Sequence, residues 1–221
     1  MEKKDKKDKE EVKVTKKKGM NLPNKITCVR LLLAVVVLVI LCLPWSSLGW
    51  TDEARIVPIM GEQVDIAIII AGVLFAIGSF TDFLDGYIAR KNNIVTDFGK
   101  VMDAIADKVL VNGVLIILAY KGIIPSIIVP VIIITRDIAV DSIKMVSGNK
   151  GKVVAASWPG KIKTICMMIG VTLAMFYNMP FAFIGKGIHV DYLFIGVAVV
   201  MSVISGVQYF LANKDFIFQE V

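Results

Sequence analysis

Long apolar runs dominate the pattern of hydrophobic and polar positions along this chain. There are six, at about residues 25–43, 64–89, 96–119, 123–145, 161–180 and 190–212. An α-helix needs roughly 20 apolar residues to cross the hydrocarbon core of a bilayer, and each run is about that long. The pattern therefore predicts an all-α integral membrane protein with six transmembrane helices. Pro130, inside the fourth run, predicts a kink there.

The composition supports a membrane protein. Of the 221 residues, 56% are hydrophobic, and the mean hydropathy of +0.72 is too apolar for an ordinary soluble domain. Residues 1–19 are the exception, since they are rich in lysine and glutamate and almost free of apolar side chains. We therefore predict a disordered charged tail over 1–19, a membrane domain over 20–214 and a short C-terminal tail over 215–221.

The charges between the runs predict an orientation. The segment 44–65 is mainly acidic, whereas the N-terminus and the loops after the second and fourth runs are basic. Basic loops stay on the cytoplasmic side of a membrane. This pattern predicts a multi-pass protein of the cell (cytoplasmic) membrane with both termini in the cytoplasm. No basic stretch carries interleaved aromatic residues or a nucleic-acid motif, which argues against nucleic acid as a partner.

Four aspartates flank the connection between the second and third runs. Asp82 and Asp85 are three residues apart, and Asp103 and Asp107 are four apart, so each pair shares one face of its helix. A charged side chain at the centre of a spanning helix costs roughly 2.5–3.5 kcal/mol, so these carboxylates need a counter-charge. Hard oxygen donors with no His or Cys nearby favour Mg²⁺ or Mn²⁺. The pattern predicts a site for one or two such ions at the cytoplasmic end of these helices.

Residues near the aspartates are suited to a phosphate-bearing ligand. Gly86 and Gly99 permit close approach of the backbone, and Arg90 offers a planar fork for phosphate oxygens. Together with a metal they describe a diphosphate site. The alternative is a structural ion-pair network around Arg90, but four acids against Arg90 and Lys108 leave excess negative charge.

The spacing D-x-x-D-G-x-x-A-R-x8-G-x-x-x-D-x-x-x-D over residues 82–107 resembles the signature of the CDP-alcohol phosphotransferase family. The resemblance implies a six-helix membrane enzyme, usually a homodimer, that uses divalent metal, here two ions, to attack a CDP-linked substrate with an alcohol and release CMP. The metal ligands that it implies are Asp82, Asp85, Asp103 and Asp107, with Asp107 also as the catalytic base. Contacts to the CDP-lipid are implied at Gly86, Ala89, Arg90 and Gly99.

Two further stretches resemble the bacterial members that use CDP-diacylglycerol as donor and glycerol 3-phosphate as acceptor. One is residues 21–30, in which Asn24 and Thr27 would contact the cytidine. The other comprises residues 136–137 and 154–164, although Arg-Glu is frequent in that branch where this chain has Arg-Asp. The resemblance thus covers residues 20–212 and narrows the expected acceptor.

A basic group, Arg136, Lys161 and Lys163, also fits a phosphorylated acceptor by its chemistry. The simpler interpretation is that these lysines set the topology or meet anionic lipid headgroups. One helix turn further on, we expect Asp141 and Lys144 to form a structural ion pair.

Two alternatives remain at the level of sequence. The first is the same chemistry with another acceptor, such as inositol 1-phosphate, serine or phosphatidylglycerol. The second is a cation- or proton-coupled transporter, in which intramembrane carboxylates line a path. Transporters usually place such groups near the midplane and often contain internal repeats, and neither feature is evident in this chain.

Overall fold

The computed structural model describes the backbone of residues 22–59, 62–91, 97–149, 157–181 and 189–217. The side chains of 22–25, 82–91, 97–98, 100, 149, 180 and 215–217 lie outside the described part. The predicted N-terminal tail and most of the predicted C-terminal tail also lie outside it.

Six long helices form the body of the described chain. They are α1 (Leu22–Cys42), α3 (Ile66–Lys91), α4 (Asp97–Tyr120), α5 (Ile128–Asn149), α6 (Trp158–Met175) and α7 (Val190–Ile217). Each falls on one of the six apolar runs, so the predicted helical class is confirmed. By length and hydropathy one helix of the described part, over Val190–Lys214, passes as a membrane span.

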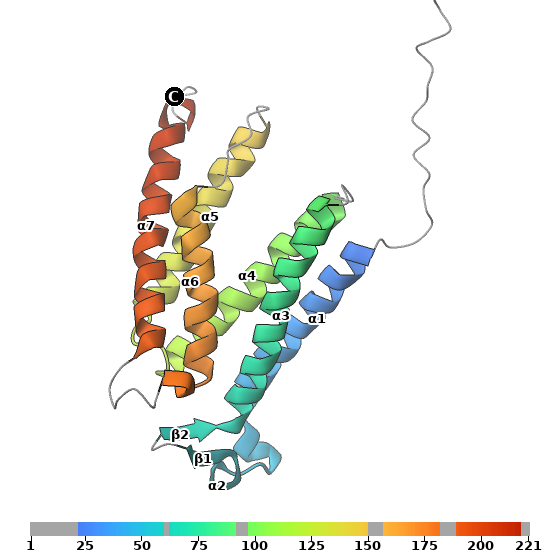
Figure 1. Ribbon diagram of the computed structural model, residues 1–221, viewed down its shortest axis with the longest axis vertical. Helices are drawn as coiled ribbons and strands as arrows, with labels where there is room; N and C mark the ends of the chain where they lie inside the picture. Colours follow the sequence, from blue (N-terminus) through green and yellow to red (C-terminus); the bar gives the residue numbers. More distant parts are fainter. Residues whose placement is uncertain (1–21, 60–61, 92–96, 150–156, 182–188, 218–221) are drawn as a thin grey trace, which may run out of the picture.

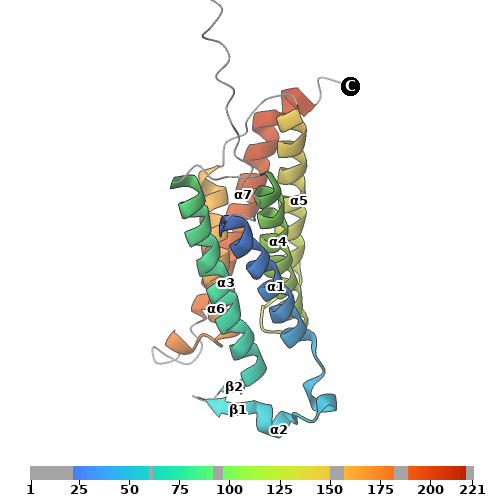
Figure 2. The same ribbon diagram turned by 90° about the vertical axis from the view of Figure 1, so that its right-hand side faces the viewer.

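The long helices alternate in direction and pack as two groups of three. In one group α1 lies against α3 and α4, and in the other α7 lies against α5 and α6 (Figures 1 and 2). Contacts of α3 with α6 and of α4 with α5 join the groups. A single apolar core runs through both, with Phe75, Leu115, Met167 and Ile195 among its fully buried side chains. Because the helices alternate, the first residues of α1 and the last of α7 lie at the same end (Figure 1).

The fourth apolar run becomes helical later than predicted. Gly122 has a positive φ of 73°, and the helix α5 begins only at Ile128. The N–H of Ile128 donates a hydrogen bond to the side-chain hydroxyl of Ser126. Pro130 therefore lies in the first turn, where proline is tolerated because there is no preceding turn for its ring to disturb. The kink predicted at Pro130 is wrong for this reason.

The acidic segment between the first two runs contains structure that the pattern did not predict. It includes the short helices η1 (Trp45–Leu48) and α2 (Asp52–Arg55) and a hairpin of β1 (Ile56–Ile59) antiparallel to β2 (Glu62–Asp65). This cap lies at the end of the bundle opposite the first residues of α1 (Figure 1). The described residues are thus helical with one two-stranded antiparallel sheet.

Helix α7 buries small polar side chains and exposes apolar ones. Ser202 and Ser205 are fully buried, whereas Val200, Val203 and Val207 are 55%, 49% and 52% exposed. A soluble domain would have the opposite arrangement. Small polar residues between helices and apolar residues on the outside are typical of helices that face lipid.

Candidate active site

Asp103 and Asp107 lie one turn apart near the start of α4, as the spacing predicted. Asp103 is paired with Arg30 of α1, whose Nη1 donates a 2.7 Å hydrogen bond to Oδ1 of Asp103. The Arg30 side chain is only 2% exposed, while that of Asp103 is 49% exposed. Arg30 was missed as a site residue, although an arginine within an apolar run is itself a signal that a partner is required.

The other half of the motif lies on α3, which includes positions 82 to 91. The C-terminal end of α3 and the N-terminal end of α4 lie at the same end of the bundle (Figure 1). The side chains of the predicted site residues Asn24, Asp82, Asp85, Ala89 and Arg90 lie outside the described part, and of Gly86 the structure describes the backbone within α3. Their roles in the site are therefore predictions from the sequence.

The two described carboxylates, Asp103 and Asp107, are suitable ligands for a hard divalent cation. Among the described side chains, no three His, Cys, Asp or Glu residues form a metal-binding group, and this set excludes both aspartates of α3. Asp103 and Asp107 offer carboxylate oxygens on one face of α4, and the bond from Arg30 engages only Oδ1 of Asp103. The second oxygen of Asp103 can act as a ligand, and it is a hard oxygen donor of the kind that Mg²⁺ and Mn²⁺ prefer.

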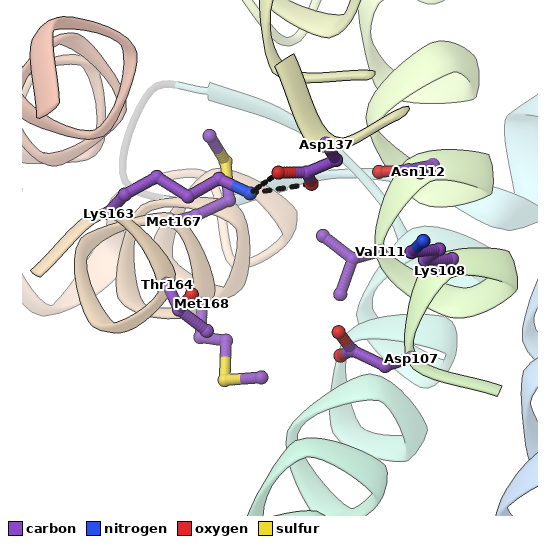
Figure 3. Close-up of a pocket in the computed structure, with 9 residues that line it drawn as sticks. All are labelled: Asp107, Lys108, Val111, Asn112, Asp137, Lys163, Thr164, Met167 and Met168. Atoms are coloured by element: carbon purple, nitrogen blue, oxygen red, sulfur yellow. Dashed lines mark hydrogen bonds and ion pairs between the residues drawn. The ribbon is translucent and has the colours of Figure 1, made fainter. Parts of the chain in front are cut away.

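A pocket opens beside Asp107 between α4, α5 and α6 (Figure 3). The lining residues are Asp107, Lys108, Val111, Asn112, Asp137, Lys163, Thr164, Met167 and Met168. The carboxylate of Asp107 points into this space, and the ammonium of Lys163 reaches Asp137 on its far side (Figure 3). Asn112 also lines it, one turn after Lys108, and was not singled out from the sequence.

Lys163 is buried and bonded at the pocket wall. Its Nζ donates to both oxygens of Asp137, at 2.9 Å to Oδ1 and 2.7 Å to Oδ2, and its side chain is 9% exposed. Asp137 also accepts from Nη1 of Arg136 at 2.9 Å. A single carboxylate is thus paired with two cations, and the group keeps an excess of one positive charge.

Arg136 turns from the pocket toward α7. Its Nη2 donates to the hydroxyl of Ser205, and its guanidinium carbon lies 5.7 Å from the ring centroid of Tyr209. Lys161 is exposed and lies over the ring of Trp158, at 5.2 Å from the centroid. Of the three residues predicted to bind the acceptor phosphate, Lys163 alone lines the described pocket.

The start of α6 is fixed to α7 by hydrogen bonds around Ser157. Ser157 is the N-cap of α6, accepts from the N–H of Gly160, and lies 2.9 Å from the hydroxyl of Ser205. Its own N–H donates to the Tyr209 hydroxyl at 3.1 Å. A Cβ at position 160 would lie 3.3 Å from Nη2 of Arg136, so glycine leaves room for the guanidinium there.

Lys108 and Asp141 form an ion pair between α4 and α5. The predicted pair of Asp141 with Lys144 is therefore wrong. Lys144 instead lies over the ring of Tyr209, 5.4 Å from its centroid. Spacing along one helix did not reveal that α4 presents a closer cation to Asp141.

Thr27 and Gly99 are the two predicted CDP-lipid contacts within the described side chains. Thr27 is buried on α1, one turn before Arg30, and Gly99 is half-buried in the first turn of α4. Thr27 and Arg30 therefore share the face of α1 that meets α4 through Asp103.

In this apolar helical bundle, the end of α4 carries two aspartates and lies beside a pocket with a buried lysine. The profile of the CDP-alcohol phosphatidyltransferase family matches residues 20–207, so the chain belongs to this family. It is an enzyme of the transferase class, and membrane association fits both the family and the apolar helix α7.

Curated relatives carry more specific names. The chain is 40% identical over 197 residues to a CDP-diacylglycerol–glycerol-3-phosphate 3-phosphatidyltransferase of Bacillus subtilis, covering 88% of this chain and 96% of the relative. A protein of the same name from Rickettsia bellii is 31% identical over 202 residues, covering 89% and 97%. A probable phosphatidylglycerophosphate synthase of Mycobacterium tuberculosis is 32% identical over 190 residues, covering 86% and 79%.

Proposed function

We propose that this protein is a phosphatidylglycerophosphate synthase. It transfers the phosphatidyl group of CDP-diacylglycerol to glycerol 3-phosphate and releases CMP, a step of phospholipid biosynthesis. The observation that carries the proposal is that Asp107 of α4 and Lys163 of α6 line one pocket. A carboxylate that can accept a proton and an ammonium that can bind phosphate are thereby placed on either side of the same space (Figure 3).

Asp82, Asp85, Asp103 and Asp107 would hold two Mg²⁺ or Mn²⁺ ions between the ends of α3 and α4. When bound, the ions neutralise the diphosphate and stabilise the charge that develops on the departing CMP. Arg30 holds Asp103 by the 2.7 Å hydrogen bond to Oδ1, which limits the orientations that this carboxylate can take.

The donor would lie beside the same helix ends. Arg90 binds its diphosphate as a planar fork. Close backbone approach is provided by Gly86, Ala89 and Gly99. Asn24 and Thr27 contact the cytidine, and Thr27 lies one turn before Arg30, on the face of α1 that meets α4.

The acceptor would enter the pocket of Figure 3. Lys163 binds its phosphate, and Arg136 and Lys161 add positive charge nearby. Asp107 takes the proton from the primary hydroxyl of glycerol 3-phosphate as the hydroxyl oxygen attacks the β-phosphorus of the donor. A bond forms between that oxygen and the β-phosphorus, and the bond from the β-phosphorus to the bridging oxygen of the diphosphate breaks. CMP leaves with the electron pair.

We further propose six transmembrane spans, with both termini and the active site on the cytoplasmic side. The alternating helices and the outward apolar face of α7 support this arrangement. At the cytoplasmic side of the membrane, the pocket can receive a soluble acceptor while the lipid donor enters from the bilayer. A homodimer is part of the same proposal, on the basis of family membership.

The test is CMP release by purified protein with CDP-diacylglycerol and Mg²⁺, offered glycerol 3-phosphate, inositol 1-phosphate and serine separately. Release with glycerol 3-phosphate alone supports the proposal. Release only with another acceptor preserves the reaction and changes the substrate. No release from folded protein with any of these acceptors would contradict the proposed reaction.

A matched pair of variants tests the carboxylate chemistry. Asp85→Asn removes one proposed ligand and should abolish CMP release from folded protein. Asp52→Asn makes the same chemical change at the opposite end, on an exposed carboxylate bonded to Arg55, and should leave the rate unchanged. Full activity of Asp85→Asn would overturn the metal assignment.

A further inference from the structure

The proposed acceptor pocket contains its own anion. Asp137 lies between Lys163 and Arg136 and accepts three charge-assisted hydrogen bonds from them, at 2.9, 2.7 and 2.9 Å. Two of the three donor positions of the Lys163 ammonium are directed at this one carboxylate. The geometry is what a bound phosphate would be expected to have with the same lysine.

Burial explains why the lysine needs such a partner. The Lys163 side chain is 9% exposed, and a cation buried to that degree is costly unless it is paired. Asp137 is the carboxylate paired with Lys163, whereas Asp141, one turn further along α5, is paired with Lys108. In the absence of acceptor, Asp137 is therefore the carboxylate that holds the Lys163 ammonium in place.

We infer that Asp137 is a specificity-determining residue that occupies the anion position on Lys163 until a phosphorylated acceptor displaces it. This inference rests on the proposed function, since it concerns the acceptor end of the same pocket. A phosphate monoester dianion competes well with one carboxylate for the ammonium, whereas a zwitterion or a monovalent anion competes poorly. Asp137 thereby sets a threshold of charge that an acceptor must exceed.

Arg136 gives the displacement a defined direction. It bonds Asp137 through Nη1 and is itself fixed by Ser205 and the ring of Tyr209. When the acceptor takes Lys163, Asp137 retains this second cation and stays paired. The carboxylate therefore changes from bridging two cations to serving one, and no buried charge is left alone.

The experiment measures binding of inorganic phosphate by thermal melting of the purified full-length protein in detergent, without added divalent cation. Asp137→Asn keeps the shape and an accepting oxygen but removes the competing charge. We expect it to lower the phosphate concentration that gives half of the maximal melting shift by on the order of tenfold, as expected for one charge-assisted hydrogen bond. Asp137→Glu, which keeps the charge, should respond as the wild type does.

Two controls locate the effect. Asp52→Asn, at the opposite end of the bundle, should bind phosphate as the wild type does. Asp137→Asn combined with Lys163→Gln should lose the gain, because the added affinity acts through Lys163. Equal phosphate dependence of the wild type and Asp137→Asn, or a gain that persists without Lys163, would overturn the inference.

The double variant also covers a single variant that fails to fold. If Asp137→Asn is unstable because Lys163 is left unpaired, Asp137→Asn with Lys163→Gln should fold and melt near the wild-type temperature. A double variant that remains unfolded would show that Asp137 stabilises the fold through Arg136, its second cation, and not through Lys163, against the inference.

Phosphate binding is separable from turnover. A tenfold gain in the phosphate affinity of Asp137→Asn, together with no CMP release by the wild type from glycerol 3-phosphate, would support the role of Asp137 and reject the proposed reaction. CMP release with unchanged phosphate binding in Asp137→Asn would do the reverse.

Discussion

Nη1 of Arg30 lies 2.7 Å from Oδ1 of Asp103, and this hydrogen bond joins α1 to α4 through two residues that are 73 positions apart in the sequence. The arginine is almost fully buried and the aspartate is half exposed. One oxygen of the carboxylate is thus held from within the bundle while the side chain still reaches the outside. Such an arrangement orients a metal ligand, and it relates α1 directly to the motif shared by α3 and α4.

Arg30→Met should lower CMP release by about 10- to 100-fold, the usual effect of losing a group that orients a metal ligand. The substitution removes the buried charge and leaves Asp103 able to turn toward water, so melting should change little. The Mg²⁺ concentration needed for half-maximal rate should rise. Steady-state rates over a Mg²⁺ titration measure both.

The matched control for Arg30 is Arg55→Met. Arg55 also pairs with aspartates, Asp52 at 2.8 Å and Asp65 at 3.1 Å, but at the cap. Loss of Arg55 should lower the melting temperature without changing the Mg²⁺ concentration needed for half-maximal rate. An unchanged Mg²⁺ requirement in Arg30→Met would contradict the orienting role of Arg30.

Asp107→Asn should reduce CMP release by at least about 100-fold, the lower range for loss of a general base. Binding of glycerol 3-phosphate should persist, since Lys163 lies on the other side of the pocket. Turnover and a glycerol 3-phosphate melting shift are measured on the same sample. Loss of the melting shift together with activity would show that Asp107 holds the pocket together rather than accepting a proton.

Removal of divalent metal should stop CMP release, and added Mg²⁺ should restore it. Mg²⁺ should also raise the melting temperature, because an ion that binds only the folded state stabilises it by mass action. Asp103→Asn should weaken this stabilisation, since it removes one of the proposed ligands. A melting temperature that is insensitive to both EDTA and Mg²⁺ would count against a resident ion.

Gly170→Ala should destabilise the packing of α6 on α7. Its Cβ would lie 2.8 Å from Cγ1 of Ile195 and 3.1 Å from the Ile195 backbone nitrogen, so a backbone must move. Overpacking of this kind costs about 1–3 kcal/mol of unfolding free energy. Denaturation in mixed micelles, with turnover measured alongside, provides the comparison.

Gly196→Ala is the control for Gly170→Ala, because nothing lies within 4 Å of a Cβ at position 196 on α7. It should be neutral or stabilise by up to about 1 kcal/mol through helix propensity. Equal effects of the two alanines would show that close approach of α6 and α7 does not limit stability.

The prediction of helices succeeded because the signal is local. Each apolar run is long enough to be recognised without knowledge of its neighbours, and all six became helices. The start of α5 and the hairpin at residues 56–65 were missed because they depend on a turn at Gly122 and on strand pairing, which hydropathy does not report.

The sequence by itself determined the six helices, the family through the spacing over 82–107, and the pair Asp103 and Asp107 on one face of α4. Only the tertiary structure decided that Arg30 meets Asp103, that Asp141 pairs with Lys108, and that Asp137 bridges Lys163 and Arg136. The physical reason is that these helices are apolar on most sides, so periodicity does not fix which face of a helix turns inward. Close packing sets that rotation, and rotation selects which polar side chains meet.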